Sequence, residues 1–173
     1  MNNEKDNVYD LVEDFYAHDE GWNTLLRQEY AEGFLRMEAW KGKKNSDLYR
    51  SWDNLTMLCL YLGSAETFLG DMNADDFIDC IAWCGRNISE FTPDYKNTQD
   101  FLETCDGLFK YLKGKNAISN DTVPATAAEI LLQEGKMNII LPDGSFDEAN
   151  AERAWNATPD IPAKIFLNIG ERL

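Results

Sequence analysis

The sequence predicts a mainly α-helical fold, and three observations lead to this prediction. Apolar residues recur three or four positions apart, the spacing of one helix face, in at least five separate segments. The alternation of apolar and polar residues that is typical of a strand occurs in one segment at most. Glycine and proline stand between the periodic segments, where helices end or begin. We therefore expect a helical bundle core with N-terminal helices and a small α-rich C-terminal appendage containing one short strand or hairpin.

The N-terminal part contains two helical patterns. The apolar positions of the first are Val8, Leu11, Val12, Phe15 and Tyr16. The second begins at Trp22, and we expect its buried stripe to be Leu25, Leu26, Tyr30, Phe34, Met37 and Trp40. It should end at 41–45, Lys-Gly-Lys-Lys-Asn, because glycine favours the residue after a helix and cations complement the C-terminal dipole.

The third pattern covers residues 47–62, and its second half is apolar on all sides, as expected of a helix central to a bundle. We expect its main buried stripe to be Leu48, Trp52, Leu55, Cys59 and Leu62. Gly63 is predicted to end this helix, with a short helical turn at 65–69 after it.

Two more patterns follow, each with a clear start. Asn73 is predicted to cap a helix, with Asp76 as the third residue after the cap. The stripe of this helix is Phe77, Ile78, Ile81, Cys84 and Ile88. Thr92-Pro93 is predicted to open the next helix, which Gly114 closes. The stripe of that helix is Phe101, Leu102, Cys105, Leu108, Phe109 and Leu112.

The composition changes after Ile118, so we divide the chain into a helical domain, 1–118, and a C-terminal appendage, 119–173. In the appendage we expect a short helix from Val123 to about Gln133 and a short strand over 138–141 followed by a turn. Two final helices are expected over 147–155 and from Pro162 to the last residue.

Residues of about 47–120 resemble the helical core-binding domain of the phage-integrase (tyrosine recombinase) family. The resemblance rests on Leu58-Cys-Leu-Tyr-Leu-Gly63, on Gly70-Asp-Met-Asn-Ala-Asp-Asp-Phe77, and on Leu108-Phe-Lys-Tyr-Leu112 followed by Gly114-Lys-Asn-Ala-Ile118. It implies a SAM-like four-helix bundle over about 47–118 and an ancestry in DNA binding. It covers under half of the chain, and the Arg…His-x-x-Arg…Tyr set of the catalytic half is absent.

The charge distribution opposes DNA binding. The chain carries a formal net charge of −15, and residues 51–109 hold eleven acids against two cations, Arg86 and Lys96. A clamp on a duplex has to neutralise several phosphates, so this distribution predicts no duplex binding above non-specific levels.

The other cations form two groups, which we interpret as helix-end charges that face water. The alternative is that both groups meet in space as one contact patch, made of Lys41, Lys43, Lys44, Arg50, Lys110, Lys113 and Lys115. Arg36 lies next to the first group.

Three constellations have the residue types of a chemical site. His18 follows Asp14 by one helical turn and could be oriented by it for proton transfer. Asp71-x-Asn73-x-Asp75 matches the first ligand positions of a calcium loop, but the loop has no glycine at its sixth position and no glutamate at its twelfth. The third constellation is the four cysteines, which are Cys59, Cys80, Cys84 and Cys105. We interpret them as packed thiols rather than as zinc ligands, and the other two constellations as a solvated histidine and a helix cap.

The function indicated is that of a non-catalytic helical protein that binds a partner, either another protein or a second copy of itself, through exposed aromatic residues. No cofactor and no metal are expected. Two alternatives stay open: a nucleic-acid-associated protein derived from an integrase-type domain, and an enzyme with an unrecognised carboxylate site. The N-terminus lacks the pattern of a signal peptide and the longest apolar run is 57–62, so we expect a cytoplasmic protein with no membrane association.

Overall fold

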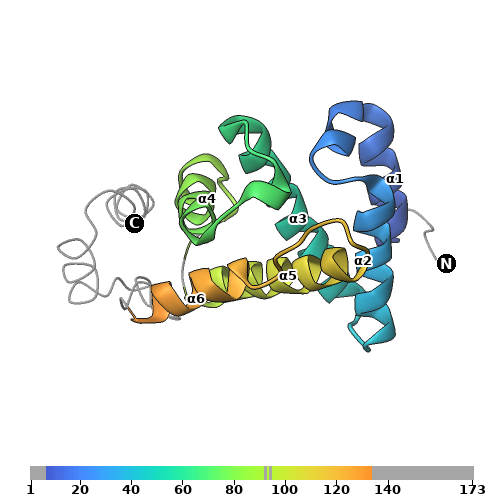
Figure 1. Cartoon of the computed structure of the whole chain (residues 1–173). Helices are drawn as coiled ribbons and strands as arrows, with labels where there is room; N and C mark the ends of the chain where they lie inside the picture. Colours follow the sequence, from blue (N-terminus) through green and yellow to red (C-terminus); the bar gives the residue numbers. More distant parts are fainter. Residues whose placement is uncertain (1–6, 92, 94, 134–173) are drawn as a thin grey trace.

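The computed structural model describes residues 7–91, 93 and 95–133, and it is mainly helical, as predicted (Figure 1). Within these residues 78% are helical and none forms a strand. The α-helices are α1 (Val8–His18), α2 (Gln28–Trp40), α3 (Asn45–Ala65), α4 (Ala74–Asn87), α5 (Tyr95–Gly114) and α6 (Val123–Gln133). Two short 3₁₀ turns, η2 (Glu20–Thr24) and η3 (Leu69–Asp71), lie between them.

Helix α3 lies at the centre and contacts α1, α2, α4 and α5. The whole predicted stripe of this helix is buried, and so are most of the residues on its other sides between 57 and 62. Leu60 is the exception, with 46% of its surface exposed. A long helix that is apolar on nearly all sides therefore forms the axis of the core, as its sequence indicates.

The predicted end of this helix at Gly63 is wrong. Helix α3 continues to Ala65, and Glu66 closes it in the left-handed conformation with φ 53°. The backbone N–H of Thr67 then donates to the carbonyl of Leu62 at 3.2 Å. A glycine inside a helix costs only about 1 kcal/mol, which the packing of α3 outweighs. The helical turn expected at 65–69 lies instead at Leu69–Asp71.

The second predicted helix also has a different start. Trp22 lies in η2, where its ring packs edge-on against Phe15 of α1 with centroids 4.4 Å apart. Arg27 is extended, and the side-chain carbonyl of Asn23 accepts the N–H of Gln28 at 3.0 Å. Packing against α1 therefore holds the Trp22 segment as a separate turn, and α2 begins at Gln28.

The starts and ends of α4 and α5 largely follow the prediction. The Asn73 side chain accepts the N–H of Asp76 at 2.9 Å, and the Asp76 carboxylate accepts the N–H of Asn73 at 2.9 Å. This reciprocal pair is a capping box. Helix α5 begins two residues after Pro93 and ends at Gly114. The six residues of its predicted stripe are all buried.

Helix α6 has the predicted bounds and packs along α4 and α5. Its Ala127 and Leu131 are buried in the same core as the preceding helices, although the division drawn from composition falls before it, at 118. The strand at 138–141 and the two helices expected after it lie outside the described residues. No described helix is both long and apolar enough to cross a membrane.

Helices α2 and α5 approach each other closely at two glycines. Gly33 of α2 lies against the ring of Tyr111, where an added methyl group would overlap the phenol. Gly107 of α5 lies against Phe34 and Glu38, with 3.1 Å between the position of an added methyl and the nearest ring carbon. Because both residues are glycines without a side chain, α5 can approach the middle of α2 closely (Figure 1).

Candidate interaction surfaces

The first predicted basic group lies at the C-terminal end of α2 and is partly neutralised. Lys43 forms an ion pair with Glu38, 3.1 Å between Nζ and Oε2, and the Glu38 side chain is only 8% exposed. Arg36 stacks over the ring of Tyr9 at 4.1 Å from the centroid. Lys41 and Lys44 are exposed in the turn that joins α2 to α3.

The second basic group lies at the C-terminal end of α5 and is paired with acids of its own. Lys110 donates to the Asp106 carboxylate at 2.7 Å, and this hydrogen bond raises the pKa of the lysine. Lys113 lies 3.5 Å from the Asp121 carboxylate. Lys115 lies over the ring of Tyr111 at 5.7 Å.

The seven predicted patch residues lie in the turn between α2 and α3, on α3, and at or just after the end of α5. In Figure 1 the turn that carries the first group follows the lower end of α2, whereas α5, whose C-terminal end carries the second group, meets the middle of α2. Arg50 lies on α3, in the groove described below. Ion pairs with Glu38, Asp106 and Asp121 reduce the positive field of both groups.

Trp40 is the feature that the sequence analysis placed wrongly. It was predicted to be buried, yet 93% of its surface is exposed. The buried face of α2 is formed by Ala31, Phe34, Leu35 and Glu38. Trp40 follows Ala31 by nine residues, about 2.5 helical turns, so it points to the opposite side. The nine-residue spacing from Ala31 indicates that Trp40 is exposed, but the buried face of α2 is hard to recognise in the sequence because one of its four residues is the charged Glu38.

The turn after Trp40 fixes the backbone at the end of α2. Gly42 has φ 95°, which favours glycine, and its N–H donates to the carbonyl of Ala39 at 3.0 Å. The N–H of Lys43 donates to the carbonyl of Glu38 at 3.3 Å. These two bonds form a Schellman motif, which ends α2 directly after Trp40.

We call the surface formed by Trp40, Lys41, Lys43 and Lys44 the basic tip. Trp22, Trp52 and Trp83, the other tryptophans within the described residues, are buried or half-buried. Of the three lysines, Lys43 is paired with Glu38, while Lys41 and Lys44 are exposed in the turn that follows Trp40. The Asp47 carboxylate accepts the backbone N–H of Lys44 at 3.3 Å, so the basic tip combines one large apolar side chain with a net charge of about +1.

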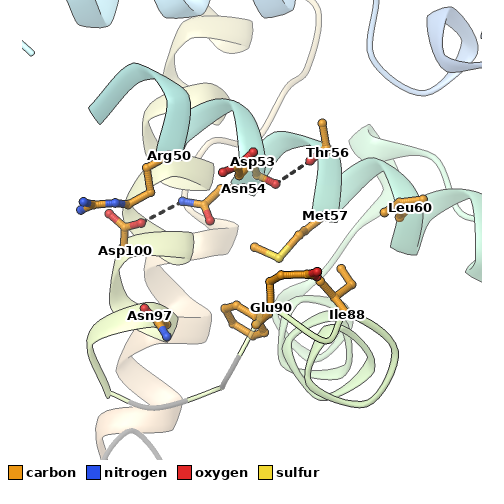
Figure 2. Close-up of a pocket in the computed structure, with 11 residues that line it drawn as sticks. Arg50, Asp53, Asn54, Thr56, Met57, Leu60, Ile88, Glu90, Asn97 and Asp100 are labelled. Carbon is orange, nitrogen blue, oxygen red and sulfur yellow. Dashed lines mark hydrogen bonds between the residues drawn. The ribbon is translucent and has the colours of Figure 1, made fainter. Parts of the chain in front are cut away.

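A second surface is a groove of about 430 Å³ between α3, residues 88–91 and the start of α5 (Figure 2). We call it the acidic groove, because three carboxylates and one guanidinium are among the described residues that line it. Its apolar floor includes Met57 and Phe91, which are 8% and 5% exposed. The lining residues are Arg50, Asp53, Asn54, Thr56, Met57, Leu60, Ile88, Glu90, Phe91, Asn97 and Asp100.

A buried polar network forms one wall of the acidic groove. The Asn54 amide donates to the Asp100 carboxylate at 3.0 Å and to the Thr104 hydroxyl at 2.9 Å (Figure 2 shows the first bond). Asn54 is 4% exposed, so these bonds replace the water it loses on folding. They also fix α3 against α5. On the rim, partial burial raises the pKa of the Asp53 carboxyl.

The three constellations considered as chemical sites have structural partners. His18 is exposed, with Nδ1 2.8 Å from the Asp14 carbonyl. Asn73 of the calcium-like loop caps α4. Within the described residues, no three His, Cys, Asp or Glu side chains gather closely enough to hold a metal ion.

All four cysteines are buried and reduced. Burial raises the pKa of the Cys59 thiol to about 12, and it also raises the pKa values of Cys80 and Cys105. Cys80, which no predicted stripe contained, is fully buried as well. The thiols thus act as small apolar side chains in the core.

The chain matches no protein-family model, no curated protein and no solved structure.

Proposed function

We propose that this chain is a non-catalytic protein–protein interaction module that binds its partner through the basic tip. The observation that carries this proposal is the 93% exposure of Trp40 on a fixed turn at the end of a helix. Tryptophan is the residue type most enriched among the side chains that dominate protein–protein binding energies.

Burial of the Trp40 side chain in a complex would contribute more binding free energy than burial of a smaller exposed side chain. An aromatic side chain of this size buries roughly 150–250 Å² of surface in a complex. At about 25 cal/mol per Å², this corresponds to about 4 to 6 kcal/mol before the costs of association. The rigid turn lowers these costs, because little backbone freedom is lost on binding.

The acidic groove supports binding more than catalysis. No histidine, cysteine or serine is among the described residues that line it, and the Thr56 hydroxyl donates to the backbone carbonyl of Asp53 at 2.7 Å. Asp100 is already engaged by the buried amide of Asn54. The ion pairs of Lys43, Lys110 and Lys113 count against a phosphate-binding surface, since each paired lysine releases fewer counterions.

The finer description of the fold also belongs to this proposal. We propose that the bundle over about 47–118 is SAM-like, as its resemblance to the integrase core-binding domain implies, and that a short strand or hairpin follows it. A cytoplasmic location and descent from a DNA-binding domain are part of the same hypothesis. The described part of this span contains three α-helices, α3, α4 and α5, and the 3₁₀ turn η3 between α3 and α4 stands where a four-helix bundle would have a further helix.

Site-specific photo-crosslinking tests the proposed function. A photoreactive phenylalanine derivative replaces Trp40 in one variant and Phe68, an aromatic residue that is 62% exposed, in a matched control. We expect discrete crosslinked species from position 40 in the cells that produce the protein, and none from position 68. If position 40 gives no species beyond those of position 68, the proposal fails.

A further inference from the structure

We propose that the partner of the basic tip is a second copy of this chain, with Trp40 of one copy seated in the acidic groove of the next. This inference rests on the proposed function and adds the identity of the partner. It depends on the complementarity of two surfaces of the same molecule in charge, in polarity and in size.

The charges of the two surfaces are opposite. Among its described lining residues, the acidic groove has Asp53, Glu90 and Asp100 against Arg50, a formal net charge of −2. The basic tip presents Lys41 and Lys44, since Glu38 balances Lys43, and the carboxylate of Asp47 at the start of α3 leaves it with a net charge of about +1. Contact between the two surfaces would bring each lysine toward a carboxylate, which steers association and fixes its orientation. The net charge of −15 opposes this encounter at long range, but salt at physiological strength screens it beyond about 8 Å.

The apolar parts also match. The floor of the acidic groove contains Met57 and Phe91, and the exposed Leu60 stands on its edge. Methionine adapts its shape to an incoming aromatic ring, and sulfur–aromatic contacts are favourable by about 0.3–1.5 kcal/mol. A groove of about 430 Å³ lies within the range of roughly 300–1,000 Å³ that is typical of ligand pockets, so an indole fits.

Contact between two different surfaces has a consequence for the assembly. The contact is either reciprocal, in a twofold dimer in which each tip enters the other copy's groove, or head to tail, in a ring or an open chain. One aromatic side chain and a few charges make a small interface, which is typical of weak, transient contacts. We therefore expect dissociation constants between about 1 μM and about 1 mM.

Charge reversal with mixing is the experiment that tests this inference. One variant carries Lys41→Glu and Lys44→Glu in the tip, and a second carries Asp53→Lys and Glu90→Lys in the groove. By sedimentation velocity, each variant alone should remain monomeric, because its tip and groove have the same sign. An equimolar mixture should associate again, because each tip then meets a groove of opposite charge.

Two single substitutions complete the design in the wild-type background. Trp40→Ala should weaken self-association by about 30-fold or more, the loss expected of a dominant interface residue. Phe68→Ala, which removes another exposed aromatic side chain, should leave it unchanged.

The inference is overturned if wild-type protein stays monomeric up to about 1 mM. It is also overturned if the mixture does not associate, or if Trp40→Ala has no effect on self-association. Crosslinks from position 40 to a different protein, with purified protein monomeric, would reject the second copy as partner and leave the proposed function standing. Absence of crosslinks from position 40 would reject the proposed function itself.

Discussion

Replacement of Gly33 by alanine tests how closely α2 and α5 approach. Alanine is favoured over glycine inside a helix by about 1 kcal/mol, so the substitution alone should stabilise α2. The added methyl would overlap the hydroxyl of Tyr111 and come within 2.9 Å of its ring carbon Cζ. The Tyr111 ring would have to move, and it would then lose its packing against Phe34. Overpacking of this kind costs about 1–3 kcal/mol.

We therefore expect Gly33→Ala to lower the free energy of unfolding by about 1 kcal/mol, the overpacking cost less the gain in helix propensity. Gly63→Ala is the matched control, because Gly63 also lies inside a helix and its added methyl would be 3.7 Å from Leu25, an ordinary contact. This control should raise the free energy of unfolding by up to about 1 kcal/mol. It also tests where α3 ends, since a glycine that terminated the helix with positive φ would not tolerate alanine.

Urea denaturation followed by far-UV circular dichroism measures both effects. The slope of free energy against urea should be equal in all variants, so that shifts in midpoint report stability. Tyr111→Phe, which removes the overlapping hydroxyl, should recover part of the loss when combined with Gly33→Ala. If Gly33→Ala is as stable as Gly63→Ala, the close approach of α2 and α5 described above is incorrect.

Three further predictions concern the acidic groove and the core. Asn54→Asp removes two buried donors and places a carboxylate beside Asp100, so it should lower the free energy of unfolding by about 2–4 kcal/mol at pH 7. This loss should shrink as falling pH protonates the two carboxylates, and a loss that is independent of pH in urea titrations would contradict the hydrogen-bond network of Asn54. Burial raises the folded-state pKa of Asp53 above its ordinary 3.8, so the ionised carboxylate lowers the stability of the fold at pH values above this pKa. Asp53→Asn should therefore raise the melting temperature at pH 7 but not at about pH 3, and an equal rise at both pH values would contradict the burial of Asp53. The four thiols should react with Ellman's reagent about 1,000-fold more slowly in native protein than in urea, and rapid labelling of any one would show that it is accessible.

The sequence predicts helices well where local signals and packing agree. The cap at Asn73 and the stripe from Phe101 to Leu112 are confirmed because side-chain capping and helical periodicity are local properties. Gly63 was misplaced because glycine is tolerated inside a helix when tertiary packing supports it. The end of α3 is set instead by Glu66, a residue with no preference for the left-handed conformation.

The candidate surfaces were less accessible to prediction. The lysines of the basic tip were recognised, but Trp40 was assigned to the core because the buried Glu38 concealed the true stripe of α2. The burial of Glu38 depends on its ion pair with Lys43 and on its packing against Gly107 of α5, and these contacts cannot be read from the sequence of α2 alone. The acidic groove was not predicted at all, because Asn54 and Asp100 are 46 positions apart and only the packing of α3 on α5 joins them.

The measurement that tests the central claim most directly is a concentration series of ¹⁵N–¹H correlation spectra. The chain has five tryptophans, whose indole N–H signals are resolved from the backbone and can be assigned with single Trp→Phe variants. The account predicts that the Trp40 indole signal and the Asn54 side-chain amide signals shift together as the concentration rises, while the Trp52 signal stays fixed. A Trp40 signal that is independent of concentration, or one that shifts without Asn54, would contradict it.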